Sequence, residues 1–208
     1  KKSPTVYFGG EIVNPTSEHV VLFKGDMALD TAYLDENNRF SFQLDSVDAG
    51  LHHFNHFPEL QYVFLEAGDS LQLRLNTVDF DESLAFSGTN EQINNFLLEM
   101  FLTNELQEEL IYNYYSLEPE AFLLKIDSLK NLKLESLNSL SNEAELSNGA
   151  MEIAKAGIMY TSYISKEAYP FYHKKKKGEK SIHDLPPDFY DYRANINYDD
   201  KDLGYYRP

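Results

Sequence analysis

The sequence predicts an α+β protein in which an antiparallel β-sandwich comes first and a helical region follows. Up to Gly88, apolar and polar residues alternate in short runs separated by turn residues, which is typical of half-buried strands. Beyond Gly88, apolar residues recur three and four positions apart, which is typical of helices that bury one face. We therefore divide the 208 residues into a β-sandwich module at 1–88 and a helical segment at 89–208, which we expect to be incomplete at its carboxyl-terminal end.

The β-sandwich module contains seven or eight predicted strands. In the clearest of them, residues 70–75, leucines alternate with polar residues. Gly9 and Gly10 interrupt the first strand, which indicates a bulge or a close approach of neighbouring backbone. Short runs at regular spacing favour an antiparallel sandwich or barrel of about 85 residues. The predicted strands are residues 5–13, 19–24, 27–34, 40–44, 51–57, 61–66, 70–75 and 83–86.

A capping box marks the predicted start of the helical segment. Thr89 is followed three residues later by Gln92, a spacing that lets two side chains satisfy the first free amide groups of a helix. Apolar residues then fall on one helical face and continue to Tyr115. The sequence therefore predicts a long first helix directly after the β-sandwich module.

Three more helical segments are predicted. Pro119 suits the first turn of the second helix. The third helix is expected to start near Asn142 and to be ended by Pro170 and the lysine run that follows. A short fourth segment is expected around residues 189–194.

Composition limits the classes of function. The net charge is −16, with −9 of it in residues 1–88, so we expect no nucleic acid partner and repulsion from anionic membranes. The absence of cysteine excludes disulfides, thiol nucleophiles and thiolate metal sites from this chain. No apolar stretch approaches the roughly 20 residues of a transmembrane helix. Because the chain starts at Lys1 and not at Met, we expect either a removed signal peptide or an artificial start.

Three histidines form a candidate metal site. His52, His53 and His56 lie in one predicted strand, and alternation places His52, Phe54 and His56 on the same face. A metal-dependent hydrolase built on His52 and His56 is one hypothesis, but no acidic residue lies at a helpful local spacing and three ligands are the usual minimum. The alternative is a half-exposed strand that carries polar aromatic residues. We favour the alternative, and we predict no catalytic, cofactor-binding or metal-binding residue and no cofactor.

Acidic residues form two further groups. Asp79, Asp81 and Glu82 lack the glycine and the distal glutamate of a twelve-residue calcium loop, so we interpret them as a solvated turn between strands. The same interpretation applies to Asp199, Asp200 and Asp202.

The residues from Lys174 to Lys177 form a basic run in an acidic chain. Such a run is able to tether a phosphate or an anionic lipid. More often it forms a solvated loop, and we predict the loop here.

Seven tyrosines are concentrated in the helical segment. Tyrosine buries a large area and keeps a polar tip, so this set suits an interface or a surface for sugar stacking. The alternative, which we favour, is packing in the core and between the two parts of the chain. The seven are Tyr112, Tyr114, Tyr115, Tyr160, Tyr163, Tyr169 and Tyr172.

Several segments together resemble a known family. They are residues 34–42 (LDENNRFSF), 64–73 (FLEAGDSLQL), 84–97 (LAFSGTNEQINNFL) and, late in the chain, 185–192 (LPPDFYDY). The chain is similar to the amino-terminal region of envelope-anchored, TlpA-like thiol-disulfide oxidoreductases of Gram-negative bacteria. In that family a β-sandwich module of unknown function leads into a helical segment, and a thioredoxin-like domain comes last.

The resemblance implies a non-catalytic role for these residues. The redox chemistry of the family belongs to a Cys-x-x-Cys pair in the thioredoxin-like domain, and this chain has no cysteine, so no catalytic residue is carried over. We expect a truncated piece, a cleaved fragment or a relative that lost the domain. The expected partners are protein clients or the missing thioredoxin-like domain, and the expected location is the cell envelope, periplasmic or anchored to the outer membrane by a lipid upstream. The alternative hypothesis is a glycan- or peptide-binding module of the envelope.

Overall fold

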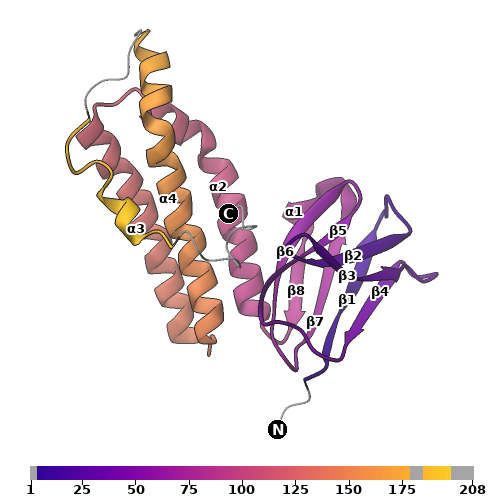
Figure 1. Cartoon of the computed structure of the whole chain (residues 1–208). Helices are drawn as coiled ribbons and strands as arrows, with labels where there is room; N and C mark the ends of the chain where they lie inside the picture. Colours follow the sequence, from indigo (N-terminus) through magenta and orange to yellow (C-terminus); the bar gives the residue numbers. More distant parts are fainter. Residues whose placement is uncertain (1–3, 179–184, 198–208) are drawn as a thin grey trace.

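The computed structural model describes residues 4–178 and 185–197 and confirms the α+β fold class. Two β-sheets lie face to face, and three long helices pack beside them (Figure 1). Within the described residues, every strand ends at or before Gly88 and every long helix begins after it. The change of periodicity in the sequence thus coincides with the last residue of the last described strand.

Each sheet has four strands. In sheet A the order is β4-β1-β7-β8, and in sheet B it is β3-β2-β5-β6. Neighbouring strands are antiparallel with one exception among the described pairs: β1 and β7 run parallel, and β2 to β6 lie between them in the chain. The strands are β1 (Val6–Val13), β2 (His19–Lys24), β3 (Met27–Tyr33), β4 (Arg39–Leu44), β5 (Gly50–His56), β6 (Glu59–Leu65), β7 (Ser70–Asn76) and β8 (Ala85–Gly88).

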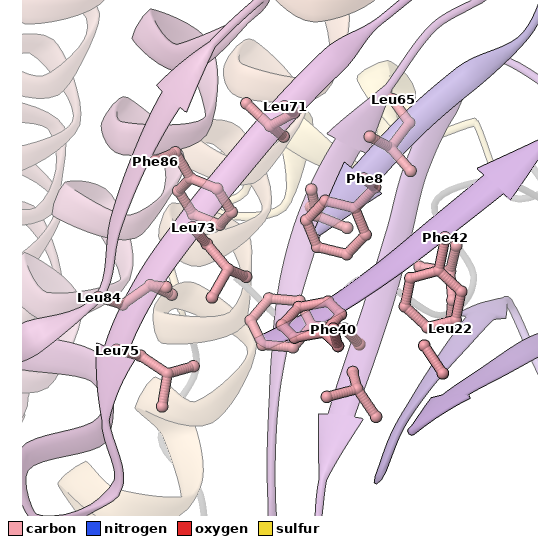
Figure 2. Packing of buried hydrophobic residues seen from close by; sticks show 14 of the residues in the cluster. Phe8, Leu22, Phe40, Phe42, Leu65, Leu71, Leu73, Leu75, Leu84 and Phe86 are labelled. Carbon is pink, nitrogen blue, oxygen red and sulfur yellow. The ribbon is translucent and has the colours of Figure 1, made fainter. Parts of the chain in front are cut away.

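The main hydrophobic core fills the space between the two sheets (Figure 2). Phe8 of sheet A lies at its centre, fully buried, with its ring centroid 6.0 Å from that of Phe42 and 5.8 Å from that of Phe54 in sheet B. Burial of a phenylalanine side chain contributes about 2–3 kcal/mol to folding, so these three phenylalanines stabilise the sandwich strongly.

Gly9 and Gly10 allow the backbones of sheet A to approach closely. A Cβ atom on Gly10 would lie 2.3 Å from the carbonyl oxygen of Leu73, and one on Gly9 would lie 2.5 Å from that of Phe40. The pairing of β1 with β4 and β7 continues without interruption through both glycines. Of the two expected explanations, close approach is therefore correct and a bulge is not.

The helical part is a bundle of three long helices. Consecutive helices are joined by short turns and run in opposite directions. Pro119 is the first residue of its helix, as predicted. None of the helices in the described residues combines the length and the apolar content that a membrane span requires. The helical elements are η1 (Thr77–Asp79), α1 (Phe80–Ser83), α2 (Glu91–Tyr114), α3 (Pro119–Glu143), α4 (Asn148–Lys177) and η2 (Asp191–Asn195), the last of which overlaps the predicted fourth segment.

The predicted capping box at the start of α2 does not form. Asn90, with a positive φ of 58°, precedes the helix, and no side-chain hydrogen bond caps it. The hydroxyl of Thr89 instead accepts a hydrogen bond of 2.6 Å from the backbone N–H of Ser70. The prediction for Thr89 and Gln92 is wrong because Thr89, just after β8, is bound to Ser70 of β7, to whose carbonyl its own N–H donates a hydrogen bond of 2.9 Å.

The boundaries of α4 also differ from those predicted. The helix begins at Asn148 and not near Asn142, because the hydroxyl of Ser147 accepts a hydrogen bond of 3.1 Å from the backbone N–H of Ala150 and caps the helix there. At the other end, Pro170 lies inside the helix. The helix therefore runs past the point at which the sequence predicted it to end.

Two side chains, one on each side of Pro170, anchor α4 to the neighbouring turn. The hydroxyl of Tyr169 donates a hydrogen bond of 2.7 Å to the carbonyl of Leu117, and Nδ1 of His173 lies 2.8 Å from the carbonyl oxygen of Tyr115. Both carbonyls belong to the turn between α2 and α3. These tertiary contacts offset the hydrogen bond that a proline removes from a helix.

The helices dock on the sandwich through two adjacent asparagines of α2. The side-chain amide of Asn94 makes two hydrogen bonds with the backbone of Phe64 in β6, and that of Asn95 makes two with the backbone of Phe86 in β8. β6 and β8 are the edge strands of sheets B and A. A second apolar cluster lies at this junction, with Leu51 and Phe64 of sheet B packed against α2, α3 and α4.

Candidate functional site

The histidines of β5 serve the fold. His52 and His56 are almost completely buried, so the expectation of a half-exposed strand is wrong for both. Nδ1 of His52 lies 3.0 Å from the carbonyl oxygen of Gly50. Nε2 of His56 accepts a hydrogen bond of 3.0 Å from the N–H of Thr16, and its Nδ1 lies 3.1 Å from the carbonyl oxygen of His19. Because both ring nitrogens of His56 are used within the protein, the pair is not arranged as a metal site.

Burial keeps these imidazoles neutral. It lowers the pKa of His52 to about 4, and Nε2 of that ring has no hydrogen-bond partner in the part of the chain that the structure describes. Burial also lowers the pKa of His56, whose Nε2 accepts a hydrogen bond only when it is unprotonated. Among residues 4–178 and 185–197, no three His, Cys, Asp or Glu residues come together as metal ligands.

His53 points to the outer face of sheet B. Its ring stacks on that of Phe23 with centroids 4.8 Å apart and contacts the ring of Tyr62 edge-on at 6.3 Å. The three residues are partners across β2, β5 and β6. Because the rings cover one another, this row stabilises the sheet and leaves little open aromatic face.

The first acidic group lies in a short helical connection. Asp79 ends η1, and Asp81 and Glu82 lie in α1, between β7 and β8. The carboxylate of Asp81 accepts a hydrogen bond of 2.8 Å from the side chain of Gln61 in β6, and burial raises the pKa of Asp81. This group therefore links α1 to sheet B. The second group, Asp199, Asp200 and Asp202, lies outside the described residues.

The lysine run forms the last turn of α4, so the prediction of a loop is wrong. Lys177 donates a hydrogen bond of 3.0 Å to the carboxylate of Glu118, and the ammonium of Lys176 lies 3.9 Å from the centre of the Tyr112 ring. Cations also stabilise the carboxyl-terminal end of a helix through its dipole. The run thus fastens the end of α4 to its neighbours.

Most of the seven tyrosines pack inside the helical bundle. The two exposed rings lie 5.8 Å apart but stand at 80° to each other, so they do not form a flat stacking surface. Tyr115 and Tyr169 pack with Phe122 and Phe189 in a third apolar cluster, at the end of the bundle away from the sandwich. Tyr115, Tyr163 and Tyr169 are buried, Tyr114 and Tyr160 are half-buried, and Tyr112 and Tyr172 are exposed.

A buried lysine lies between the three long helices. Lys133 of α3 donates a hydrogen bond to the side chain of Asn104 in α2, and burial lowers the pKa of Lys133. Lys133 lines two cavities of about 20 and 10 Å³. They are about the size of one or two water molecules, so this site is too small for an organic ligand.

A groove with a volume of about 470 Å³ and polar side chains along its walls lies on the outer face of sheet A. Its floor is formed by the backbone of β4, β1 and β7. Ser41 and Gln72 stand on one side of it, and Arg39, Glu11 and Arg74 form a row across the three strands on the other. We call this hollow the sheet A groove.

The sheet A groove carries two arginines around one carboxylate. Arg39 Nη2 lies 3.8 Å from one oxygen of Glu11, and Arg74 Nε lies 3.8 Å from the other. These distances are longer than hydrogen bonds, and the arginine side chains are 65% and 68% exposed. Both guanidinium groups therefore keep donors free for a ligand.

The sequence did not point to this site. Alternation places Glu11, Arg39 and Arg74 each on the polar face of its strand, but it does not say which strands are neighbours. The row exists because β1 pairs with β4 on one side and with β7 on the other. That register was not readable from one sequence.

The resemblance to the TlpA-like family remains a proposal. A scan against protein-family models, a search of curated proteins and a search of solved structures each found no match to this chain.

Proposed function

We propose that this chain is a non-catalytic accessory region of an envelope thiol-disulfide oxidoreductase, which positions a redox domain or recruits its protein clients. The proposal rests on the resemblance of residues 34–42, 64–73, 84–97 and 185–192 to the TlpA-like family. A periplasmic or outer-membrane-anchored location belongs to the same proposal.

The observation that carries the proposal is the hydrogen-bonded junction between sandwich and helices. Asn94 and Asn95 tie α2 to one edge strand of each sheet. The hydroxyl of Ser147 donates a hydrogen bond of 2.7 Å to Glu66 at the end of β6, which ties the start of α4 to the same edge. Such a junction holds the helices at a fixed angle, which is what an arm that positions another domain requires.

The test is the reading frame of the gene on both sides of these codons. We expect a thioredoxin-like domain with a Cys-x-x-Cys pair downstream and a signal peptide with a lipid-attachment cysteine upstream. A reading frame that stops soon after Pro208 would contradict the proposal. If the domain is present, Asn94→Ala together with Asn95→Ala should slow reduction of a protein client and leave reduction of a small disulfide unchanged.

A second candidate function is a glycan- or peptide-binding module of the envelope. The sheet A groove favours it, because its volume falls in the range of about 300–1,000 Å³ typical of ligand sites. Tyr7 of β1, which is 44% exposed, adds an aromatic ring to the outer face of sheet A. Binding of the intact chain to a glycan array and to a peptide array tests this function. A chain that binds neither array would exclude it.

A further inference from the structure

We propose that the sheet A groove binds a carboxylate-bearing saccharide, such as an oligomer of uronic acids. This inference rests on the second candidate function and names its ligand class.

The first argument is the distribution of charge. Residues 4–88 contain three basic residues, Lys24, Arg39 and Arg74, in a strongly acidic module. Two of the three lie beside the same groove, although they come from strands on opposite sides of β1. The groove therefore offers cationic donors on a surface that otherwise repels anions.

The second argument is the unused hydrogen-bonding capacity of the arginines. A guanidinium group binds a carboxylate through two parallel hydrogen bonds when the geometry permits. At 3.8 Å from Glu11, neither Arg39 nor Arg74 makes that contact within the chain. A ligand carboxylate is able to take donors that Glu11 leaves free, and Glu11 remains available to accept a hydrogen bond from a ligand hydroxyl.

The third argument is the polar character of the remaining walls. The side chains of Ser41 and Gln72 project from the outer face and make no hydrogen bond to any residue that the structure describes. Together with Glu11 they offer both hydrogen-bond donors and hydrogen-bond acceptors, which suits a ligand rich in hydroxyl groups.

A saccharide fits this face better than a peptide does. The groove has no deep apolar pocket for a peptide side chain, because Phe40 and Leu73 point into the core and contribute backbone to the floor. Tyr7 lies on the same face of β1 as Glu11, four residues away and therefore about 13 Å along the strand. An exposed tyrosine ring at that distance is able to stack on a neighbouring sugar unit.

The experiment is isothermal titration calorimetry of the intact chain with trigalacturonic acid, maltotriose and triglutamate. We expect trigalacturonic acid to bind, and the other two to bind at least about tenfold more weakly. Arg39→Gln with Arg74→Gln should weaken binding of trigalacturonic acid by at least about tenfold. Glu11→Gln should tighten it, because the substitution removes a negative charge that repels the ligand carboxylate and keeps a side-chain oxygen that accepts a hydrogen bond. Lys24→Gln is the matched control, since it removes a positive charge from the same module away from the groove, and it should leave binding unchanged.

Each alternative outcome is informative. If none of the three ligands binds, this inference is wrong, and the array experiment alone decides whether the second candidate function stands. If maltotriose binds as tightly as trigalacturonic acid, or if the arginine variants bind normally, the module binds ligands but this inference is wrong. Equal or tighter binding of triglutamate would assign the groove to an acidic peptide and would also overturn the inference. Circular dichroism of each variant checks that these exposed substitutions leave the fold intact.

Discussion

Asn94 and Asn95 are neighbours in α2, yet their side chains bind edge strands of different sheets. Asn94 accepts a hydrogen bond of 2.7 Å from the N–H of Phe64 and donates one of 3.0 Å to its carbonyl. Asn95 does the same with Phe86, at 2.9 Å in both directions. Each amide thus completes the hydrogen bonding of an edge-strand residue, as a further strand would, and the helix covers both edges at once.

Replacing Asn94 should destabilise the protein more than replacing Asn95. Asn94 is buried, so Asn94→Ala leaves an N–H and a C=O of Phe64 without partners and away from water. We expect a loss of about 3 kcal/mol in the free energy of unfolding, against about 1 kcal/mol for the half-buried Asn95. Urea denaturation of both variants measures the difference.

Hydrogen exchange supplies the control for that experiment. In Asn94→Ala the amide of Phe64 should exchange much faster than in the wild type, and that of Phe86 should change less. Equal losses of stability in the two variants, or an unchanged rate at Phe64, would show that apolar packing alone holds the junction.

Substitutions at two glycines should have opposite effects on stability. Gly10→Ala places a methyl group 2.3 Å from a backbone oxygen of β7, which has no freedom to move aside, and should cost at least about 2 kcal/mol. Gly149→Ala in α4 meets no atom closer than 3.6 Å and should stabilise the protein by about 0.5 kcal/mol through helix propensity. Thermal unfolding of both variants tests the contrast, and a Gly10→Ala protein as stable as the wild type would be incompatible with the close pairing of β1 and β7.

Local pattern was sufficient to predict most elements of the fold. The alternation in residues 70–75 corresponds to β7, and Pro119 marked the first turn of α3 correctly. Both signals act within a few residues, so neighbouring sequence is enough to read them.

The features that the sequence did not predict depend on contacts between distant residues. Pro170 failed to end α4 because Tyr169 and His173 are anchored to the turn before α3. Thr89 did not cap α2 because its hydroxyl binds the start of β7. The sheet A groove was missed for the same reason, since it depends on the register of three strands.

Ser147→Ala should lower stability by about 1–2 kcal/mol. The hydroxyl accepts a hydrogen bond from the N–H of Ala150 and donates one to Glu66, so the substitution removes both a helix cap and a link to sheet B. Ser139→Ala is the matched control, because Ser139 is exposed within α3, where alanine is slightly favourable. In chemical denaturation, Ser147→Ala should lower the midpoint and Ser139→Ala should raise it slightly. Equal midpoints would show that the α4 cap contributes nothing.

The protein should lose stability as the pH falls from about 6.5 to about 4. Burial lowers the pKa of His52 from 6.5 to about 4, so the unfolded chain takes up a proton in this range that the folded chain does not. The stability that the neutral ring supports is present above pH 6.5 and is lost progressively toward pH 4. His52 alone accounts for about 3 kcal/mol across this interval, and the lowered pKa values of His53 and His56 act in the same direction.

Urea denaturation at a series of pH values tests the contribution of His52. His52→Leu removes the titrating group and the ring nitrogen that lacks a partner, so its stability should vary much less between pH 6.5 and 4 than that of the wild type. Asn55→Leu is the control, because it introduces the same side chain at a half-buried position of the same strand without removing a titrating group, and it should keep the wild-type slope. A wild-type slope in His52→Leu would mean that the other buried groups carry the acid sensitivity, since a neutral leucine takes up no proton in either state.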